Sequence, residues 1–206
     1  MGEHLYTYIN PVNEKHISEI LSLLSSGGVI ALPMGTSWAF CCDASSNKGL
    51  RKMRLLRPDH PKTQPFSLIC SDISMAATMA DIGNQSYRIL KKIFPGSFTI
   101  IVKSGKMLPK KLKDKRAKVG IRIPDEPITL EIIRRFEHPL AATSVPTKNG
   151  SPLLMGYQVF ENHGNGVDLV VDIGDELQGL DTTVIDLTGS DIEIVREGAG
   201  DISLLQ

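Results

Sequence analysis

The chain has 206 residues, of which 41% are hydrophobic, so it can bury a substantial core as one large domain or two small ones. Lys plus Arg and Asp plus Glu number 23 each, and the formal net charge is zero. This balance excludes a global electrostatic footprint for nucleic acid or membrane surfaces, but it leaves room for a local basic patch.

Membrane, secretory and metal-binding classes find no support in the sequence. No apolar run approaches the roughly 18 residues that a membrane-spanning helix needs, and residues 1–6 lack the features of a signal peptide. The cysteines Cys41, Cys42 and Cys70 are odd in number and form no CxxC motif. We therefore expect buried thiols in a reducing cytoplasm, no membrane partner and no metal site.

Hydrophobic periodicity and capping residues predict interleaved strands and helices. The predicted strands are, in chain order, residues 4–9, 29–32, 38–42, 66–70, 98–102, 119–123, 140–143, 167–171, 183–187 and 192–196. The predicted helices are residues 13–26, 46–56, a short one after Asp72, 84–94 and 127–136. Because some strands follow each other directly and no linker divides the chain, we expect one α/β domain over residues 1–206, with a mixed sheet layered by helices.

The strand predicted at residues 119–123 carries an arginine where a core residue would be expected. Alternate apolar residues would share one face, whereas Gly120 and Arg122 would share the other. The next strand is built of small residues and ends at the hydroxyl of Ser144. The pair predicts a pocket for phosphate or carboxylate, although an internal Asp or Glu could also be the partner of Arg122.

Two earlier segments allow both a structural and a functional interpretation. Residues 32–38 place the Thr36 hydroxyl at a bend, which could be an ordinary turn or part of a site. Arg54 and Arg57 lie at the end of a predicted helix, followed by residues 58–62. The helix dipole explains basic residues there, and the alternative is a cationic wall beside a nucleotide.

The C-terminal part offers a third such segment. Thr182 and Thr183 open one predicted strand, and Arg196 closes the next before Gly198 and Gly200. The guanidinium and a glycine-rich backbone could approach a ligand together, or the segment could be a surface hairpin with a charged edge.

A lysine-rich run at residues 106–118 is the remaining charged feature. Most such runs are solvated loops, and a phosphate or RNA contact is the alternative. No aromatic residue is interleaved with the run, so stacking on bases is unsupported. The five histidines form no acid–base constellation visible in the sequence, and there is no nucleophile elbow or Walker loop.

Taken together, these segments resemble the YrdC/YciO family across nearly the whole chain. The segments that carry the resemblance are, in order, residues 28–33, 38–40, 57–58, 95–99, 119–124, 139–144, 182–187 and 195–198. The resemblance implies a single α/β domain with a large, twisted, mixed sheet and a positively charged concave site. It also implies synthesis of threonylcarbamoyl-adenylate from L-threonine, bicarbonate and ATP with Mg²⁺, as in the threonylcarbamoyl modification of tRNA adenosine.

The family's site residues carry over by position. Those implied around the threonine moiety are Thr36, Arg122, Ala142 and Thr182. Those implied around the nucleotide are Arg57, Lys118, Ser144 and Arg196, with Lys118 approaching ATP mainly through its backbone. Because arginines and Mg²⁺ can supply positioning and charge neutralisation, no protein nucleophile or acid–base triad is required.

Several positions depart from the YrdC branch. Leu55 replaces a lysine, Pro146 replaces an asparagine, and Met34 and Gly35 replace a Thr-Asp pair. The segment 182–188 places the chain closer to the YciO branch. The sequence therefore predicts an enzyme that forms or processes threonylcarbamoyl-adenylate, or alternatively a protein that binds RNA (tRNA or double-stranded RNA) or a nucleotide and has lost synthesis. Carbamoyl transfer in metal-cofactor maturation is the least supported hypothesis. A related domain occurs there inside larger proteins, and the zinc-finger cysteines and extra domains of those proteins are missing from this sequence.

Overall fold

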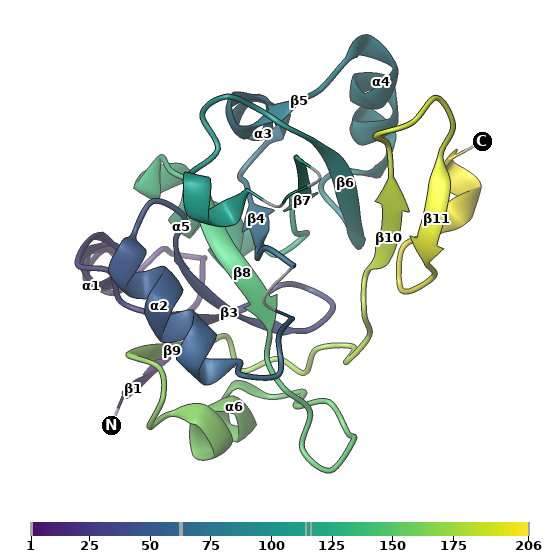
Figure 1. The fold of residues 1–206 in the computed structure, drawn as a ribbon. Coiled ribbons are helices and arrows are strands. Elements are labelled where there is room, and N and C mark those ends of the chain that lie inside the picture. Colours follow the sequence, from purple (N-terminus) through teal and green to yellow (C-terminus); the bar gives the residue numbers. More distant parts are fainter. Residues whose placement is uncertain (1, 62–63, 114, 116, 206) are drawn as a thin grey trace.

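A mixed, 11-stranded sheet runs through the protein, with helices on both of its faces (Figure 1). The computed structural model describes residues 2–61, 64–113, 115 and 117–205. Lys62 and Arg116, which belong to the basic segments singled out above, lie outside the described residues.

The elements agree closely with the strands and helices predicted from the sequence. The strands are β1 (Glu3–Tyr6), β2 (Ile30–Pro33), β3 (Trp38–Asp43), β4 (Ser67–Ile69), β5 (Ala80–Asp81), β6 (Phe98–Ser104), β7 (Lys118–Arg122), β8 (Leu140–Ser144), β9 (Leu169–Asp172), β10 (Thr183–Asp186) and β11 (Glu193–Arg196). The α-helices are α1 (Glu14–Ser25), α2 (Asn47–Leu56), α3 (Ile73–Met79), α4 (Asn84–Ile93), α5 (Pro127–Phe136) and α6 (Gly156–His163). Two 3₁₀ helices are η1 (Lys110–Leu112) and η2 (Ile202–Leu205).

Four differences from the sequence-based elements stand out. The first strand ends at Tyr6 instead of continuing to residue 9, and the short β5 and α6 were not predicted. The lysine-rich run contains η1, whose Leu112 is buried in the larger hydrophobic cluster. Leu108 of the same run is buried in this cluster too, so two apolar residues anchor a segment that composition alone describes as a solvated loop.

The strand order β1-β9-β2-β3-β8-β4-β7-β6-β10-β11 combines parallel and antiparallel pairs, as predicted. For example, β4 pairs with β7 in parallel and with β8 antiparallel. In β3, successive side chains enter different cores, because strand side chains alternate between faces. Phe40 and Cys42 of β3 belong to one buried cluster, whereas Ala39 and Cys41 belong to the other.

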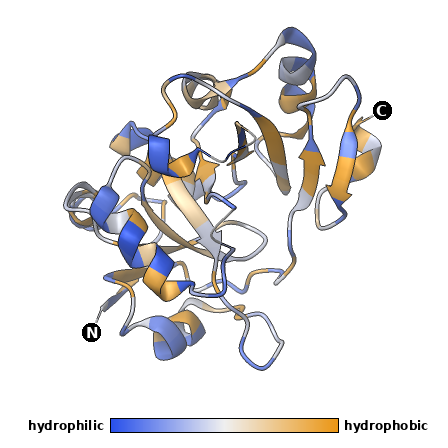
Figure 2. Cartoon of the chain, in the orientation of Figure 1, coloured by the Kyte–Doolittle hydropathy of each residue, from blue (hydrophilic) through white to orange (hydrophobic). Residues whose placement is uncertain are grey.

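Helices cover the two faces unequally. Buried residues of α2, α3, α4 and α6 join the larger cluster, and those of α1 and most of α5 join the smaller one; Leu130 of α5 joins the larger. Figure 2 shows hydrophobic strands such as β6 inside these layers, and hydrophilic residues on the outer turns of α2. Among the described residues, the smaller cluster takes none from β6, β7 or β10. Half of one sheet face is thus left uncovered by α1 and α5, and this half forms the site described below.

No helix within the described ranges is both long and apolar enough to span a membrane. The three cysteines are free and buried, which confirms that part of the sequence prediction.

Candidate functional site

A cavity of about 960 Å³ occupies the uncovered half of the sheet face. Its floor comes from alternate residues of β8, β4, β7, β6 and β10, which the strand register places side by side. Ala142 pairs with Ser67, and Gly120 lies opposite Ile101, so the small residues Ala142, Ser67 and Gly120 keep this part of the floor low. The segment between α2 and β4 and the hairpin of β10 and β11 form its walls.

Arg122 is the buried cation of this floor, with only 8% of its surface exposed. Its Nη2 donates to the carbonyl oxygen of Met34 at 2.5 Å and to Oγ1 of Thr36 at 2.8 Å. Its Nε has no hydrogen-bond partner among the described residues. Burial lowers the pKa of Arg122 to about 10, so the guanidinium is charged at neutral pH and has unused donor capacity.

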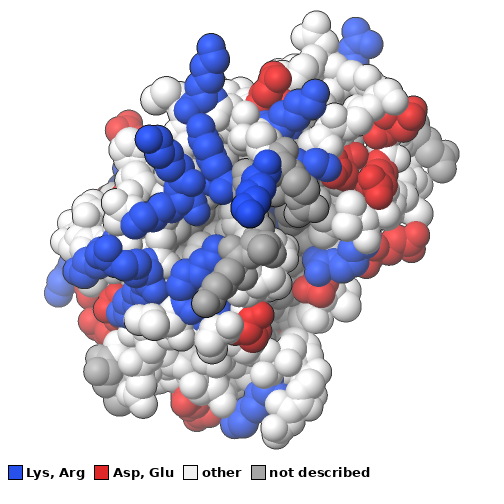
Figure 3. All heavy atoms as spheres, in the orientation of Figure 1, with Lys and Arg blue, Asp and Glu red and all other residues white. Residues whose placement is uncertain are grey.

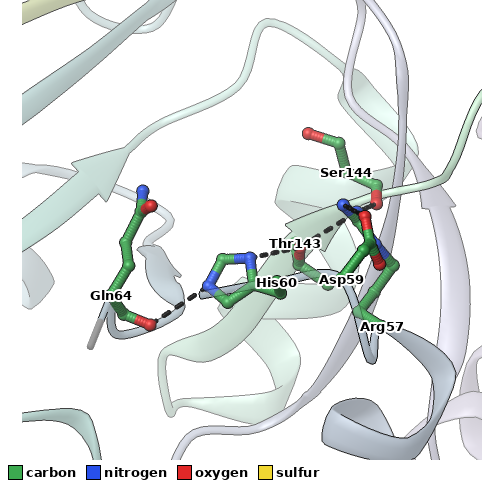
Figure 4. A network of polar contacts seen from close by, with 6 residues as sticks. All are labelled: Arg57, Asp59, His60, Gln64, Thr143 and Ser144. Carbon is green, nitrogen blue, oxygen red and sulfur yellow. Dashed lines mark hydrogen bonds and ion pairs between the residues drawn. The ribbon is translucent and has the colours of Figure 1, made fainter. Parts of the chain in front are cut away.

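Arg57 caps the C-terminal end of α2 and reaches the end of β8 (Figure 4). It donates to Oγ1 of Thr143 at 3.3 Å and to the carbonyl oxygen of Ser144. Nε and Nη2 of Arg57 donate hydrogen bonds to the Asp59 carboxylate at 2.9 and 2.8 Å. These hydrogen bonds keep the pKa of the Asp59 carboxyl below its ordinary value. The Asp59 side chain is 63% exposed, so an incoming phosphate can replace it at low cost.

The opposite wall carries two further ion pairs. Arg196 lies 3.2 Å from Asp181 and donates to the carbonyl oxygen of Thr182 at 2.9 Å. Lys118 lies 2.7 Å from Asp186. Burial would raise the pKa of Asp186, but the hydrogen bonds from Lys118 and Thr188 hold it below its ordinary value. Both cations are therefore fixed in place before any ligand binds.

His60 belongs to the wall formed by the segment between α2 and β4, and it lines the cavity. Its Nε2 is 3.1 Å from the carbonyl oxygen of Gln64, and its Nδ1 is 3.5 Å from Oγ1 of Thr143 (Figure 4). Burial and the neighbouring charges of Arg54 and Arg57 lower the pKa of His60 below 6.5, against hydrogen bonds to backbone carbonyls. The ring is consequently neutral at pH 7.

Seven of the eight residues that the family resemblance places around ligands line this one cavity. They are Arg57, Lys118, Arg122, Ala142, Ser144, Thr182 and Arg196. The eighth, Thr36, is 2% exposed and lies behind Arg122, to which it is hydrogen-bonded. The sequence also allowed an internal carboxylate as the partner of Arg122, but no ion pair of Arg122 is found within the described chain. Carboxylates instead pair with Arg57, Lys118 and Arg196.

Of the positions that depart from the YrdC branch, Met34 lines the cavity, whereas Leu55 and Pro146 do not. Leu55 is 81% exposed, and Pro146 follows the end of β8. Arg54, which the sequence suggested as a replacement for the missing lysine, lies 4.2 Å from the centre of the Phe66 ring. It donates to two carbonyl oxygens of the α2–β4 segment and lines a separate apolar pocket, so it supports the cavity wall from outside.

Sequence reasoning missed Thr143 and His60 as members of the site. Thr143 was read only as part of the strand that leads to Ser144, although its hydroxyl joins Arg57 to His60. His60 was dismissed because no second catalytic residue stands near it in the sequence. Its position three residues after Arg57 was the available signal.

Lys and Arg also gather outside the cavity. Figure 3 shows them concentrated around α2 and η1 on the side of the molecule in view, with acidic residues mainly elsewhere. Within the lysine-rich run, Lys106, Lys110, Lys111, Lys113 and Lys115 are exposed. The zero net charge therefore conceals a local basic surface.

The fold and the cavity define a class of protein: a single α/β domain whose half-covered mixed sheet carries a pocket suited to an anionic ligand. Within that class, the chain belongs to the Sua5/YciO/YrdC family, whose model, described as "Telomere recombination", matches residues 22–198. This confirms the family resemblance and the fold predicted from the sequence.

Individual relatives span nearly the whole chain. The protein YciO of Escherichia coli, described as uncharacterized, is 30% identical over 202 residues, covering 96% of this chain and 97% of YciO. Its crystal structure superimposes with a TM-score of 0.91 over 100% of both chains. The threonylcarbamoyl-AMP synthase of Psychromonas ingrahamii is 27% identical over 174 residues, covering 83% of this chain and 91% of the synthase.

A more distant structure shares the fold. Sua5 of Pyrococcus abyssi, crystallised in complex with L-threonine, superimposes with a TM-score of 0.84 at 20% identity. The match covers 96% of this chain and 57% of the Sua5 chain.

Proposed function

We propose that the protein forms or processes threonylcarbamoyl-adenylate in its large cavity, using L-threonine, bicarbonate and ATP with Mg²⁺ as substrates. Arg122 is the single observation that carries this proposal, because a buried cation with an unpartnered Nε needs an anion. Family membership adds support, since relatives include proteins named threonylcarbamoyl-AMP synthase. A structure of Sua5 complexed with L-threonine is consistent with an amino acid as one ligand.

The size of the cavity fits a conjugate larger than an amino acid. Pockets of roughly 300–1,000 Å³ enclose drug-sized ligands, and about 960 Å³ lies at the upper end of that range. The threonine carboxylate would lie on Arg122, near Thr36, Ala142 and Thr182. The phosphates would lie towards Arg57 and Ser144 on one side and Lys118 and Arg196 on the other.

In the synthetic direction, threonylcarbamate attacks the α-phosphorus of ATP and pyrophosphate leaves. The attacking carbamate is already an anion, so the protein has to align the two reactants and neutralise phosphate charge. Arg57 is suited to this role because its exposed partner Asp59 can give way to phosphate oxygens.

The test is to incubate purified protein with ATP, L-threonine, bicarbonate and Mg²⁺, and to follow pyrophosphate and AMP. The matched variants are Arg122→Met, within the cavity, and Arg134→Met, an exposed position on α5 with only a 3.9 Å contact to Glu131. We expect threonine-dependent turnover in the wild type and in Arg134→Met, and its loss in Arg122→Met. The enzymatic proposal fails if no product exceeds a control without threonine and supplied threonylcarbamoyl-adenylate is not consumed.

A second candidate function is RNA binding, which the exposed lysines around η1 favour. Phosphate contacts of this kind weaken steeply with salt, by about 0.7 log units of affinity per contact for each tenfold rise in salt on single strands. Fluorescence anisotropy with labelled tRNA would measure that slope for the wild type and for a variant with Lys110, Lys111 and Lys113 changed to Gln. Salt-independent or absent binding would count against this candidate.

A further inference from the structure

A neutral histidine in the cavity wall has one ring nitrogen that carries no proton. The Nε2 atom of His60 faces the carbonyl oxygen of Gln64, which can only accept a hydrogen bond. Nε2 must therefore carry the ring proton, and Nδ1 of the neutral ring keeps a lone pair. Figure 4 shows Nδ1 directed towards Thr143, at 3.5 Å from its Oγ1.

The surroundings of His60 keep this tautomer in place. Arg57 donates to Oγ1 of Thr143, so the hydroxyl proton of Thr143 can turn towards Nδ1. At 3.5 Å this hydrogen bond is long and weak, so an incoming water can replace it at the Nδ1 lone pair. The ring of Phe66 packs against the imidazole at 4.9 Å between centroids. The charged groups that face it are Arg54 and Arg57, and Asp59 is held by Arg57. Burial and these two cations favour the neutral, proton-accepting form at pH 7.

The position of this base distinguishes two reactions at the same phosphate. A carbamate anion attacking the α-phosphorus brings no proton that must be removed. A water molecule attacking the same phosphorus does, and it gains from a general base within hydrogen-bond reach. His60 lies beside Arg57 and Thr143, at the end of the cavity proposed for the phosphates.

We propose that the protein hydrolyses an acyl-adenylate of the carbamoyl type at its α-phosphorus, with His60 as the general base. This inference rests on the proposed function, since it assumes that the cavity holds the adenylate. Water transfers one proton to Nδ1 of His60 while its oxygen bonds to phosphorus. The bond from phosphorus to the carbamoyl oxygen breaks, threonylcarbamate leaves as an anion, AMP is formed, and His60 releases its proton to solvent.

The experiment supplies threonylcarbamoyl-adenylate to the full chain in H₂¹⁸O and measures AMP, the isotope content of AMP and the equilibrium binding of the adenylate. The variants are His60→Gln and the matched control His138→Gln, an exposed histidine that follows α5. We expect ¹⁸O in AMP, and a kcat about 100-fold lower in His60→Gln with adenylate binding unchanged. His138→Gln should match the wild type.

The pH profile separates a base from a structural residue. In the wild type, kcat should fall at acidic pH as His60, whose pKa is lowered by burial, becomes protonated, and His60→Gln should lack this limb. Thr143→Val provides a second variant that keeps the side-chain volume. Loss of the hydroxyl that donates to Nδ1 removes support for the neutral ring, so the acidic limb should move to higher pH.

Three results would overturn the inference. A wild type that binds the adenylate without producing AMP above the buffer rate would refute hydrolysis and leave the proposed ligand site intact. AMP without ¹⁸O would refute attack at phosphorus, and an unchanged rate and pH limb in His60→Gln would refute the base. A wild type that neither binds nor consumes the adenylate would remove the proposed function itself, and this inference with it.

Discussion

Replacing Arg122 with Met should leave the protein folded while removing its main anion contact. Burial lowers the pKa of Arg122 from its ordinary value to about 10, a change of more than two orders of magnitude in the acid dissociation constant. At about 1.4 kcal/mol for each tenfold change in the acid dissociation constant, burial costs the charged form roughly 3 kcal/mol. The variant recovers this cost but loses two hydrogen bonds, to Met34 and Thr36, worth about 1.5 kcal/mol each.

These opposing terms nearly cancel, so the free energy of unfolding should change by less than about 1.5 kcal/mol. Breaking a buried ion pair by removing one partner would instead cost about 3–5 kcal/mol. Urea denaturation monitored by the fluorescence of Trp38 distinguishes the two cases. Titration calorimetry with the adenylate should show affinity reduced about 10- to 100-fold, the value of one charged hydrogen bond. Strong destabilisation together with unchanged affinity would mean that Arg122 serves the core and not a ligand.

Three further predictions concern the scaffold around the cavity. Gly198→Ala should destabilise the protein by about 1–3 kcal/mol and weaken ATP binding in calorimetry, because the added Cβ would lie 2.3 Å from the carbonyl oxygen of Asp181. The control is Gly83→Ala, whose Cβ meets nothing within 4 Å and which should match the wild type. Burial raises the pKa of Cys42 and Cys70 to about 12 and also raises that of Cys41. A disulfide reagent at pH 8 should therefore label no thiol of the folded protein and all three after unfolding. Rapid labelling of the folded protein would contradict this prediction. Burial would raise the pKa of Asp168, but hydrogen bonds from Lys52 and the amide of Val29 hold it below 3.8. The carboxylate should therefore contribute about 1 kcal/mol to stability at neutral pH, and this contribution should be lost as pH falls below 4. Asp168→Asn should remove that acid-sensitive part of the unfolding free energy.

Local patterns were sufficient for much of this fold. The alternation in β7 placed Arg122 and Gly120 on one face and the apolar residues on the other, as the two buried clusters and the cavity show. Capping residues located helices equally well, because Asn13 and Asp72 accept backbone hydrogen bonds at the starts of α1 and α3.

Features that depend on distant contacts could not be predicted in this way. Helix α6 starts at Gly156 after Met155, which is not a residue that predicts an N-cap, and its capping depends on Gln158. The contact between His60 and Thr143 joins residues 83 positions apart, through a segment with no regular structure. Charge pairing at the site was likewise invisible, because Lys118 and Asp186 lie on strands separated by β6 in the sheet.

The central claim is that guanidinium groups from separate parts of the chain converge on one anionic ligand. A crystal structure soaked with L-threonine and a non-hydrolysable ATP analogue tests it most directly. We expect the threonine carboxylate on Arg122, and phosphate oxygens on Arg57 and Arg196, with Arg54 remaining on the Phe66 ring. Both ligands bound elsewhere, or a cavity left empty at saturating concentrations, would contradict the account.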